Sequence, residues 1–314
     1  MARQTGALVA LNAVFESTYG TAPATGYRTV PFGPGSRIGA KRPLLENELL
    51  GFGRDPVAPV LDAVTADGEI VVPIDVENWG MWLKGAFGAP TSTGTTPKTH
   101  TFNSGGSTLP SLSIEAAYPQ VPAFEMVSGC MVNSLRWQMR RSGLLTARVG
   151  LIAQGAAAPA AVTGAGTPTA YALQRFSPFN GEIKRNTVTL GNIVSADVEY
   201  MNNLDPVETI RADGKIDGID PSIASLKGKL TARFADLTMF NDAIAGTPAE
   251  LAFSYVIGAN AQFTFTAHAV YLERPQITVE GPNGIEVEFD FMAAKATSPA
   301  RMATAVLINT VATY

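Results

Sequence analysis

The strictest pattern in this sequence is the alternation of apolar and acidic residues from Ile285 to Phe291. In an extended chain its apolar residues share one side, and Glu286, Glu288 and Asp290 share the other. Successive side chains of a β-strand point to opposite faces, so this run predicts a strand with one buried face. Other segments alternate in the same way, with Asn-Gly and Asp-Gly turn signals between them. The sequence therefore predicts a mainly β fold.

Two short segments are the helix candidates. Asn78–Phe87 and Leu237–Ile244 are apolar without strict alternation, and Gly88 and Gly246 follow them. Glycine ends many helices because it adopts the left-handed conformation at little cost. We therefore expect two short helices, each preceded by a strand.

The strands that precede these helices form an internal repeat. Gly68–Ile74 and Gly228–Phe234 are related by a sequence offset of 160 (228 − 68), and both consist of a turn glycine followed by an alternating strand. A glycine also opens a later strand in each half, at Gly143 and Gly284, where the offset is 141 (284 − 143). The side-chain phase of these later strands does not match at that offset. The common order of elements predicts a duplicated domain.

The repeat and the composition along the chain suggest four segments. Small residues, proline and glycine between the two repeats predict a linker, and the turn-rich, weakly periodic N-terminus predicts an arm that packs elsewhere, for example on a neighbouring subunit. The expected segments are an N-terminal arm at residues 1–35, a first domain at 36–155, a linker at 156–170 and a second domain at 171–314.

The composition of the 314-residue chain argues for assembly and against several functions. Hydrophobic residues make up 46% and charged residues only 16%, well below the roughly 25% of typical soluble domains. The net charge of −4, with scattered lysine and arginine, excludes the basic face that tight DNA binding requires. No signal peptide and no membrane-spanning run is recognisable, which predicts synthesis in a cytoplasm and no membrane partner.

The residue types that carry chemistry are scarce, and we expect neither an enzyme nor a cofactor or metal site. Cys130 is the one cysteine and is expected to be buried and inert. His100 and His268 are expected at a surface or an interface, without metal-ligand spacing. The segment Asp213–Asp220 lacks the acidic pattern of a calcium loop, and Glu286, Glu288 and Asp290 on one strand indicate a solvated face rather than a glycosidase pair.

Five phrases spread over nearly the whole chain resemble the two-domain tail tube proteins of long-tailed bacteriophages. Each phrase is short, and it is their order along the chain that makes the resemblance specific. The phrases are Ala13–Pro23, Asp67–Ile70 continued by Trp82–Gly88, Gly228–Asp236, Val279–Ile285 and Val306–Thr310.

The resemblance implies a fold and an assembly. Each half would be a tail-tube-type β-sandwich with a short flanking helix, and sheets of neighbouring subunits would join around a lumen. Single-domain relatives form sixfold rings, so a duplicated chain would form a pseudo-hexameric ring from three copies, and stacked rings would form the tube. Closing a sheet into a ring removes its exposed edges.

The resemblance also suggests which residues serve the tube. Its lumen is expected to be acidic so that DNA does not adhere, which makes Glu286, Glu288 and Asp290 the lumen candidates. Loops at Lys41–Ala66 and Asp205–Lys227 are expected to bridge to the next ring. The charged candidates in these loops are Arg54, Asp55, Asp62, Asp213, Lys215, Asp217 and Asp220.

The implied partners are further copies of the chain, a tape measure protein, tail terminator and baseplate proteins, and double-stranded DNA that passes transiently. The implied location is the tail tube of the virion, after synthesis in the cytoplasm of the host bacterium. The main alternative is a carbohydrate- or receptor-binding β-sandwich of a virion. That alternative needs exposed aromatic platforms, whereas Trp79, Trp82 and Trp137 lie in segments with a core pattern. A hydrolase on a β scaffold and the tube of a contractile tail are further alternatives.

Overall fold

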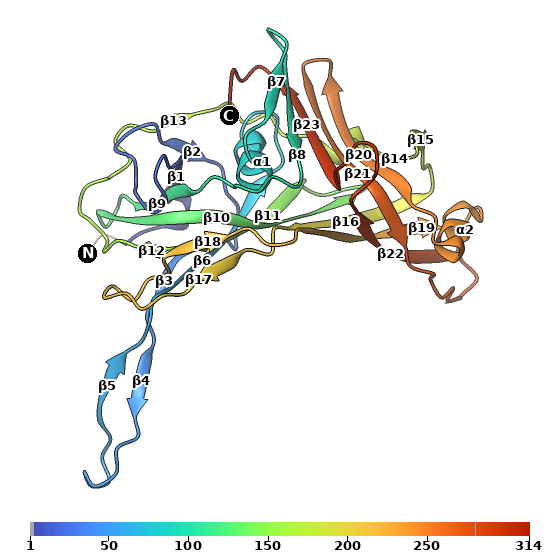
Figure 1. Cartoon of the computed structure of the whole chain (residues 1–314). Helices are drawn as coiled ribbons and strands as arrows, with labels where there is room; N and C mark the ends of the chain where they lie inside the picture. Colours follow the sequence, from blue (N-terminus) through green and yellow to red (C-terminus); the bar gives the residue numbers. More distant parts are fainter. Residues whose placement is uncertain (1–2, 280) are drawn as a thin grey trace.

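The computed structural model describes residues 3–279 and 281–314 and is built almost entirely of strands, with two short α-helices (Figure 1). The first two residues of the predicted N-terminal arm, and residue 280 in one of the resemblance phrases, lie outside the described residues. The predicted mainly β fold with two short helices is confirmed.

One long antiparallel sheet, here called the main sheet, runs through both halves of the chain. β10 and β16 are the neighbours that join the halves, with Ser134–Arg140 paired to Ser195–Met201. The two halves therefore belong to one connected sheet, and their division into tandem domains stays a prediction. In spatial order the main sheet contains β3 (Arg37–Lys41), β6 (Thr65–Pro73), β11 (Thr146–Ala153), β10 (Ala123–Arg140), β16 (Ile193–Met201), β19 (Ser225–Arg233) and β22 (Glu286–Ala294).

Further strands pack over the buried side of the main sheet in two groups. The first group surrounds the N-terminal half of β10 and consists of β1 (Ala10–Phe15), β2 (Arg28–Val30), β9 (Leu112–Tyr118), β12 (Gly155–Ala156) and β13 (Thr169–Ala170). The second group surrounds β21 (Ala261–Leu272) and consists of β20 (Ala249–Gly258), β23 (Ala303–Asn309), β8 (Lys98–Asn103), β7 (Thr91–Thr93), β14 (Gly181–Arg185) and β15 (Val188–Thr189). Residues 10–15 and 28–30 of the predicted arm thus lie in a sheet of their own chain.

The two helices begin and end within one residue of the predicted bounds. α1 (Trp79–Phe87) is almost completely buried between the layers and is followed by Gly88. α2 (Thr238–Ala245) buries only Met239, and Gly246 ends it in the left-handed conformation. The difference in burial follows from position, since α1 lies in the middle of the molecule and α2 at its rim (Figure 1).

A single core joins the two halves. Trp79 of the first half meets Phe263 of the second edge to face, with ring centres 6.0 Å apart. Trp137 meets Phe265 in the same way at 4.9 Å. The three tryptophans, including Trp82, are buried as predicted, so they form no exposed aromatic platform.

The strand registers repeat along the chain. Ile38 pairs with Gly68 on β3 and β6, and at the same offset of 160 Val198 pairs with Gly228 on β16 and β19. On the other side of the repeated strands, Ile70 pairs with Val149 and Leu230 with Phe289. The offset between Val149 and Phe289 is 140 (289 − 149), one less than the sequence-based offset of 141. This correction by one position restores the side-chain phase that did not match in the sequence, because strand faces alternate with period two.

Two hairpins leave the main sheet at equivalent points. The first hairpin, residues 42–64, contains β4 (Leu44–Asn47) and β5 (Val57–Leu61) and projects far from the body (Figure 1). The second hairpin, residues 202–224, contains β17 (Asp205–Val207) and β18 (Gly218–Asp220) and lies along the underside of the main sheet. They are equal in length, and the repeat offset of 160 relates them (202 − 42).

The predicted linker is fixed to the body rather than loose. Glu115, which is almost fully buried, accepts hydrogen bonds from the Thr163 hydroxyl and from the backbone N–H groups of Gly164 and Ala165. Thr169 and Ala170 then pair with β2 in parallel. None of the helices that the structure describes has the length and apolarity of a membrane span.

Candidate assembly surfaces

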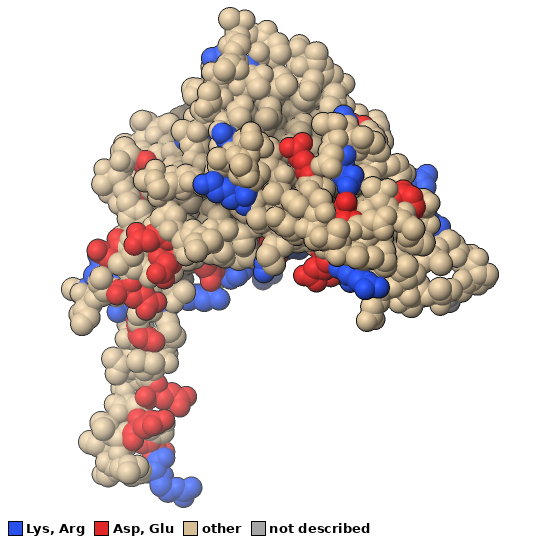
Figure 2. Space-filling model, turned by 45° about the vertical axis from the view of Figure 1, so that its right-hand side comes forward, with Lys and Arg blue, Asp and Glu red and all other residues tan. Residues whose placement is uncertain are grey.

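The solvent side of the main sheet carries charged residues on each of its strands, and we call it the charged face. It arises from strict alternation, because every other residue of the main-sheet strands points away from the core. Blue and red groups alternate along the underside of the body in Figure 2. Basic and acidic residues occur on it in nearly equal numbers: Arg37, Lys41, Arg136, Arg140, Arg148, Lys227, Lys229 and Arg233 against Asp67, Glu69, Asp197, Glu199, Glu286, Glu288 and Asp290.

The three carboxylates proposed from the sequence lie together on this face, and cations of the neighbouring strand β19 partner them. The Lys229 ammonium donates to Glu288 at 2.7 Å and lies 3.8 Å from Asp290. Arg233 lies 3.3 Å from Glu286. The hydrogen bond from Lys229 to Glu288 raises the pKa of the Lys229 ammonium. The acidic stripe is therefore largely neutralised by its own chain.

The same pairing continues across the first half and the junction. Glu69 pairs with Arg148 at 2.5 Å, between β6 and β11. Glu199 of β16 pairs with Arg136 of β10 at 2.8 Å, so this ion pair crosses from the second half to the first. Opposite charges on adjacent strands are mutually stabilising at such spacings. The charged face thus carries ion pairs between adjacent strands and is not dominated by charges of one sign.

β3 forms one open edge of the main sheet. It pairs with β6 along its whole length, and no strand among the described residues pairs with its other side. An open edge presents unpaired N–H and C=O groups that can bind another strand. Arg37 and Lys41 flank this edge on the charged face.

The opposite end of the main sheet is also incomplete. β22 pairs with β19 throughout but with β21 only from Phe291 to Ala294. The N–H of Glu273 extends this ladder by donating to the carbonyl of Asp290 at 2.8 Å. Residues 274–279 then leave the sheet without a strand partner within the described chain. The main sheet thus ends in unpaired backbone on both sides.

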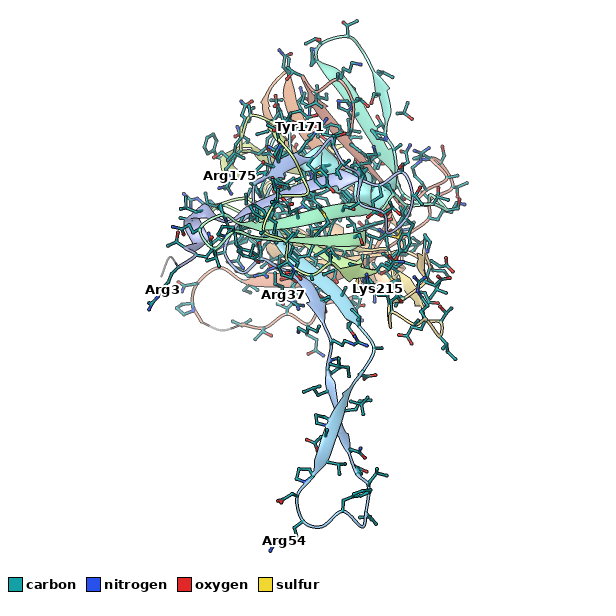
Figure 3. The ribbon with its side chains drawn as sticks, turned by 90° about the vertical axis from the view of Figure 1, so that its left-hand side faces the viewer. Arg3, Arg37, Arg54, Tyr171, Arg175 and Lys215 are labelled. Atoms are coloured by element: carbon teal, nitrogen blue, oxygen red, sulfur yellow. The ribbon has the colours of Figure 1, made fainter. Side chains whose placement is uncertain are left out.

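The first hairpin exposes apolar residues along its length. Arg54 marks its tip in Figure 3, next to Asp55, whereas Arg37 lies on β3, the strand that leads into the hairpin. Asp62 lies at its base, where its carbonyl accepts from Arg42 at 2.9 Å. Acidic groups gather along the hairpin in Figure 2. The exposed apolar residues are Leu44, Leu45, Leu49, Leu50, Phe52, Val60 and Leu61.

The remaining candidates, all in the second hairpin, lie beside the first half of their own chain. Arg211 donates to Asp213 at 3.1 Å and to Asp217 at 2.6 Å, and the hydrogen bond from Arg211 lowers the pKa of Asp213 to about 2. The Arg211 guanidinium is therefore the cation that partners both carboxylates. The side chain of Lys215 lies over Gly155, and the carboxyl-bearing Asp220 is exposed.

The side chains that could carry chemistry are used structurally. Cys130 is buried, and burial raises the pKa of its thiol, as expected for an inert cysteine. The expectation of a surface position for His100 is wrong: it is fully buried on β8, with Nδ1 2.7 Å from the Ser92 hydroxyl and Nε2 3.0 Å from the Val311 carbonyl. The threonine-rich flanks that suggest a loop are the outward residues of a strand. No cluster of metal-ligating residues occurs in the described ranges.

Sequence comparison decides the family. Residues 6–293 match the family described as phage tail tube protein. The chain belongs to the phage tail tube protein family. No curated protein matches its sequence.

Membership in the tail tube family fixes the broad function. The protein is a non-enzymatic structural component of a phage tail, is located in the virion tail and assembles with itself. The resemblance to phage tail tube proteins inferred from the five phrases is confirmed. The sequence-based interpretation missed the cations Lys229 and Arg233 that neutralise the candidate lumen residues. The signal was present, because alternation in Gly228–Arg233 puts both on the polar side of β19.

Proposed function

We propose that three copies of this tail tube protein form a pseudo-hexameric ring, that such rings stack into a tube, and that the charged face lines a lumen through which genomic DNA passes. The observation that carries the proposal is the β10–β16 junction. In the spatial order of the main sheet, this junction joins the last strand of the first repeat, β10, to the first strand of the second repeat, β16, within one chain. The same junction can form between neighbouring copies, because in the repeat β3 corresponds to β16 and β21 corresponds to β10.

The repeated registers specify the junction between copies. Ser134 pairs with both Gly150 and Met201. At the repeat offsets Gly150 corresponds to Asp290, whose carbonyl binds the N–H of Glu273, and Met201 corresponds to Lys41. Glu273 of one copy is therefore expected directly opposite Lys41 of the next. Their opposite charges support this register, since opposed charge pairs across strands are favourable.

Three copies per ring follow from two repeats per chain together with the sixfold rings of single-repeat relatives. In this ring, residues 273–279 of each copy straighten along β3 of its neighbour, so both open edges of the main sheet disappear. The junction adds backbone hydrogen bonds, which makes the sheet continuous around the ring.

The charged face suits a passage for DNA because it offers no net attraction to phosphate. Most of its cations, namely Arg37, Arg136, Arg148, Lys229 and Arg233, form ion pairs with carboxylates of adjacent strands. Few are therefore free to replace the counterions of DNA, which is the step that drives non-specific binding. We further propose that the tip of the first hairpin, with Arg54 and Asp55, contacts the next ring. At its ends the tube would meet terminator and baseplate proteins, and inside it a tape measure protein.

A cross-linking experiment tests both the register and the number of copies. A variant with Lys41→Cys and Glu273→Cys should form disulfide or short bifunctional links between copies, because directly opposed residues have Cβ atoms about 5 Å apart. Native Cys130 is buried and stays unreactive. On a denaturing gel the ladder should end at a covalent trimer, whereas a ring of six would give a ladder up to six.

A matched pair controls for chance contact. Lys41→Cys with Thr278→Cys moves the second cysteine roughly 16 Å along the strand, so this pair should stay unlinked. Electron microscopy of the same samples should show hollow tubes or rings. Rings without links at Lys41 and Glu273 would contradict the register, and ladders beyond the trimer would contradict the count.

A further inference from the structure

The two hairpins related by the repeat offset have different surroundings. In the first hairpin Leu44 pairs with Leu61, and the side chains of both are more than half exposed. In the second, Leu204 occupies the position equivalent to Leu44 and is only 7% exposed. The backbone registers nevertheless agree, since Leu45 pairs with Val60 and, at the equivalent positions, Asp205 pairs with Asp220. The hairpins therefore differ in what they pack on rather than in how they are built.

The second hairpin packs on a defined place in the first half. Leu204 and Ile219 form a small apolar cluster with Met131, and Ile152 borders it. Met131 and Ile152 are a cross-strand pair of β10 and β11. The N–H of Leu204 also donates to the Asn133 side chain at 2.9 Å. The base of the second hairpin thus packs on the Met131–Ile152 cross-strand pair, which lies at the edge of the charged face.

The second half contains the equivalent cross-strand pair, and no hairpin of the described chain covers it. Ile152 pairs with Asp67 on β6, and Met292 pairs with Lys227 on β19, the residue equivalent to Asp67 in the repeat. The cross-strand partner of Met292 on β21 is Tyr271. In the described chain Met292 is 49% and Tyr271 is 42% exposed, although large apolar side chains are usually buried.

We propose that Leu44, at the base of the first hairpin, docks on the Tyr271–Met292 pair of a neighbouring copy in the same ring. The proposal rests on the ring proposed above, in which Lys41 lies opposite Glu273 of the neighbour. Leu44 then follows Lys41 by three positions and Tyr271 precedes Glu273 by two, so the two side chains come together at the end of the paired segment. Within the chain, Leu204 likewise follows Met201 by three positions, and Met131 precedes Ser134 by three, one more than in the second half because the register shifts between Val132 and Ser134.

The docking gives the first hairpin two separate tasks. Its base fastens the neighbour within the ring, and its apolar tip, with Leu49, Leu50 and Phe52, remains free for another ring. The second hairpin performs only the first task, inside its own chain. The copy-to-copy junction therefore combines backbone pairing at β3 with an apolar contact at Leu44.

Cross-linking of paired cysteines tests the contact. Leu44→Cys with Tyr271→Cys should link neighbouring copies, and Leu204→Cys with Met131→Cys should link within one chain and so calibrate the geometry. Leu50→Cys with Tyr271→Cys, which moves the first cysteine to the hairpin tip, should not link. Ring formation is scored by microscopy in each sample. Rings that form without the Leu44 link, while the internal control closes, overturn the docking and leave the ring proposal standing; absence of rings in the wild-type chain overturns both.

A charge substitution gives an independent measurement. Leu44→Asp should raise the protein concentration needed for ring formation by about tenfold or more, because a leucine-sized apolar contact is lost and a carboxylate must be desolvated. Leu45→Asp is the matched control, since Leu45 is similarly exposed and its equivalent in the second hairpin is already Asp205. An equal effect of the two substitutions would overturn the proposal.

Discussion

Buried and half-buried polar side chains connect segments of this protein that lie far apart in the sequence. Glu16 accepts hydrogen bonds from the hydroxyls of Ser111 and Ser113 and from the N–H of Gly129. Glu115 binds the linker in the same way. Glu115 is almost fully buried, and a buried carboxylate without such donors would cost roughly several kcal/mol. Glu16 is half-buried, so the same effect holds there in weaker form, and both residues favour one arrangement of loops. None of these pairings could be predicted from the sequence, because donors and acceptors belong to segments that are remote along the chain.

Asp75 is less well satisfied than these glutamates, and its titration should be visible in stability. Oδ2 accepts from Asn78, while Oδ1 has no hydrogen-bond partner among the described residues, and burial raises the pKa of the carboxyl above 3.8. The native state then keeps a proton that the unfolded state releases. Stability from this group is full below the unfolded pKa and is lost as the pH rises through the folded pKa.

We therefore expect Asp75→Asn to gain in free energy of unfolding relative to wild type as the pH rises from about 4 to about 7. Chemical denaturation at a series of pH values measures the difference. The exposed Asp55→Asn serves as control and should show no such trend. A difference for Asp75→Asn that stays constant across this range would contradict the assignment.

At the scale of single elements, the sequence predicted most of what local physics determines. The bounds of α1 and α2 agree closely with the expected helices, because Gly88 and Gly246 mark their ends. The alternating burial of β22 follows the pattern from Glu286 to Phe291. The surface position expected for His100 was wrong because polar flanks indicate a loop and an outward strand face equally well. Burial there depends on Val311, which lies near the other end of the sequence.

Close packing between neighbouring strands explains one repeated glycine. Gly228 pairs with Phe291, and a Cβ at this position would collide with the Phe291 ring and with the Asp197 carbonyl oxygen. We expect Gly228→Ala to lower the free energy of unfolding by about 1–3 kcal/mol, the usual range for overpacking. Gly258→Ala, also on a strand but with open space around it, should change stability by less than about 0.5 kcal/mol. Denaturant unfolding of both variants checks this, and equal stabilities would rule out the packing explanation.

The whole molecule departs most from what local patterns could foretell. The repeat predicts two similar units, yet Trp79 and Phe263 place parts of both in one core, and β10 pairs with β16 across them. Where the hairpins lie was equally unpredictable, since their sequences predict two similar turns. The acidic stripe was recognised on β22, but its neutralisation by Lys229 requires the pairing of β19 with β22, which is a long-range contact.

The neutralised charged face leads to a prediction for assembled tubes. Replacing Glu286, Glu288 and Asp290 by Gln, Gln and Asn leaves Lys229 and Arg233 without partners. Tubes of this variant should retain short duplex DNA, and the retention should fall steeply with added salt. Wild-type tubes should release the DNA at every salt concentration.

The matched control also removes the cations. Adding Lys229→Gln and Arg233→Gln to the triple variant should restore release of the DNA. Filtration of labelled duplexes mixed with tubes measures both. Equal retention by the wild type and the triple variant would show that this face does not border the lumen.

Because β10 and β16 belong to the same chain, the formation of rings depends less steeply on protein concentration. Half of the junctions in a ring of three copies form inside single chains, where the partner strands meet at an effective concentration on the order of millimolar whatever the amount of protein present. The equilibrium population of complete rings then rises with the third power of subunit concentration instead of the sixth. Rings should therefore form from far more dilute protein, and incomplete arcs should be rarer, than for a single-repeat subunit with junctions of equal strength.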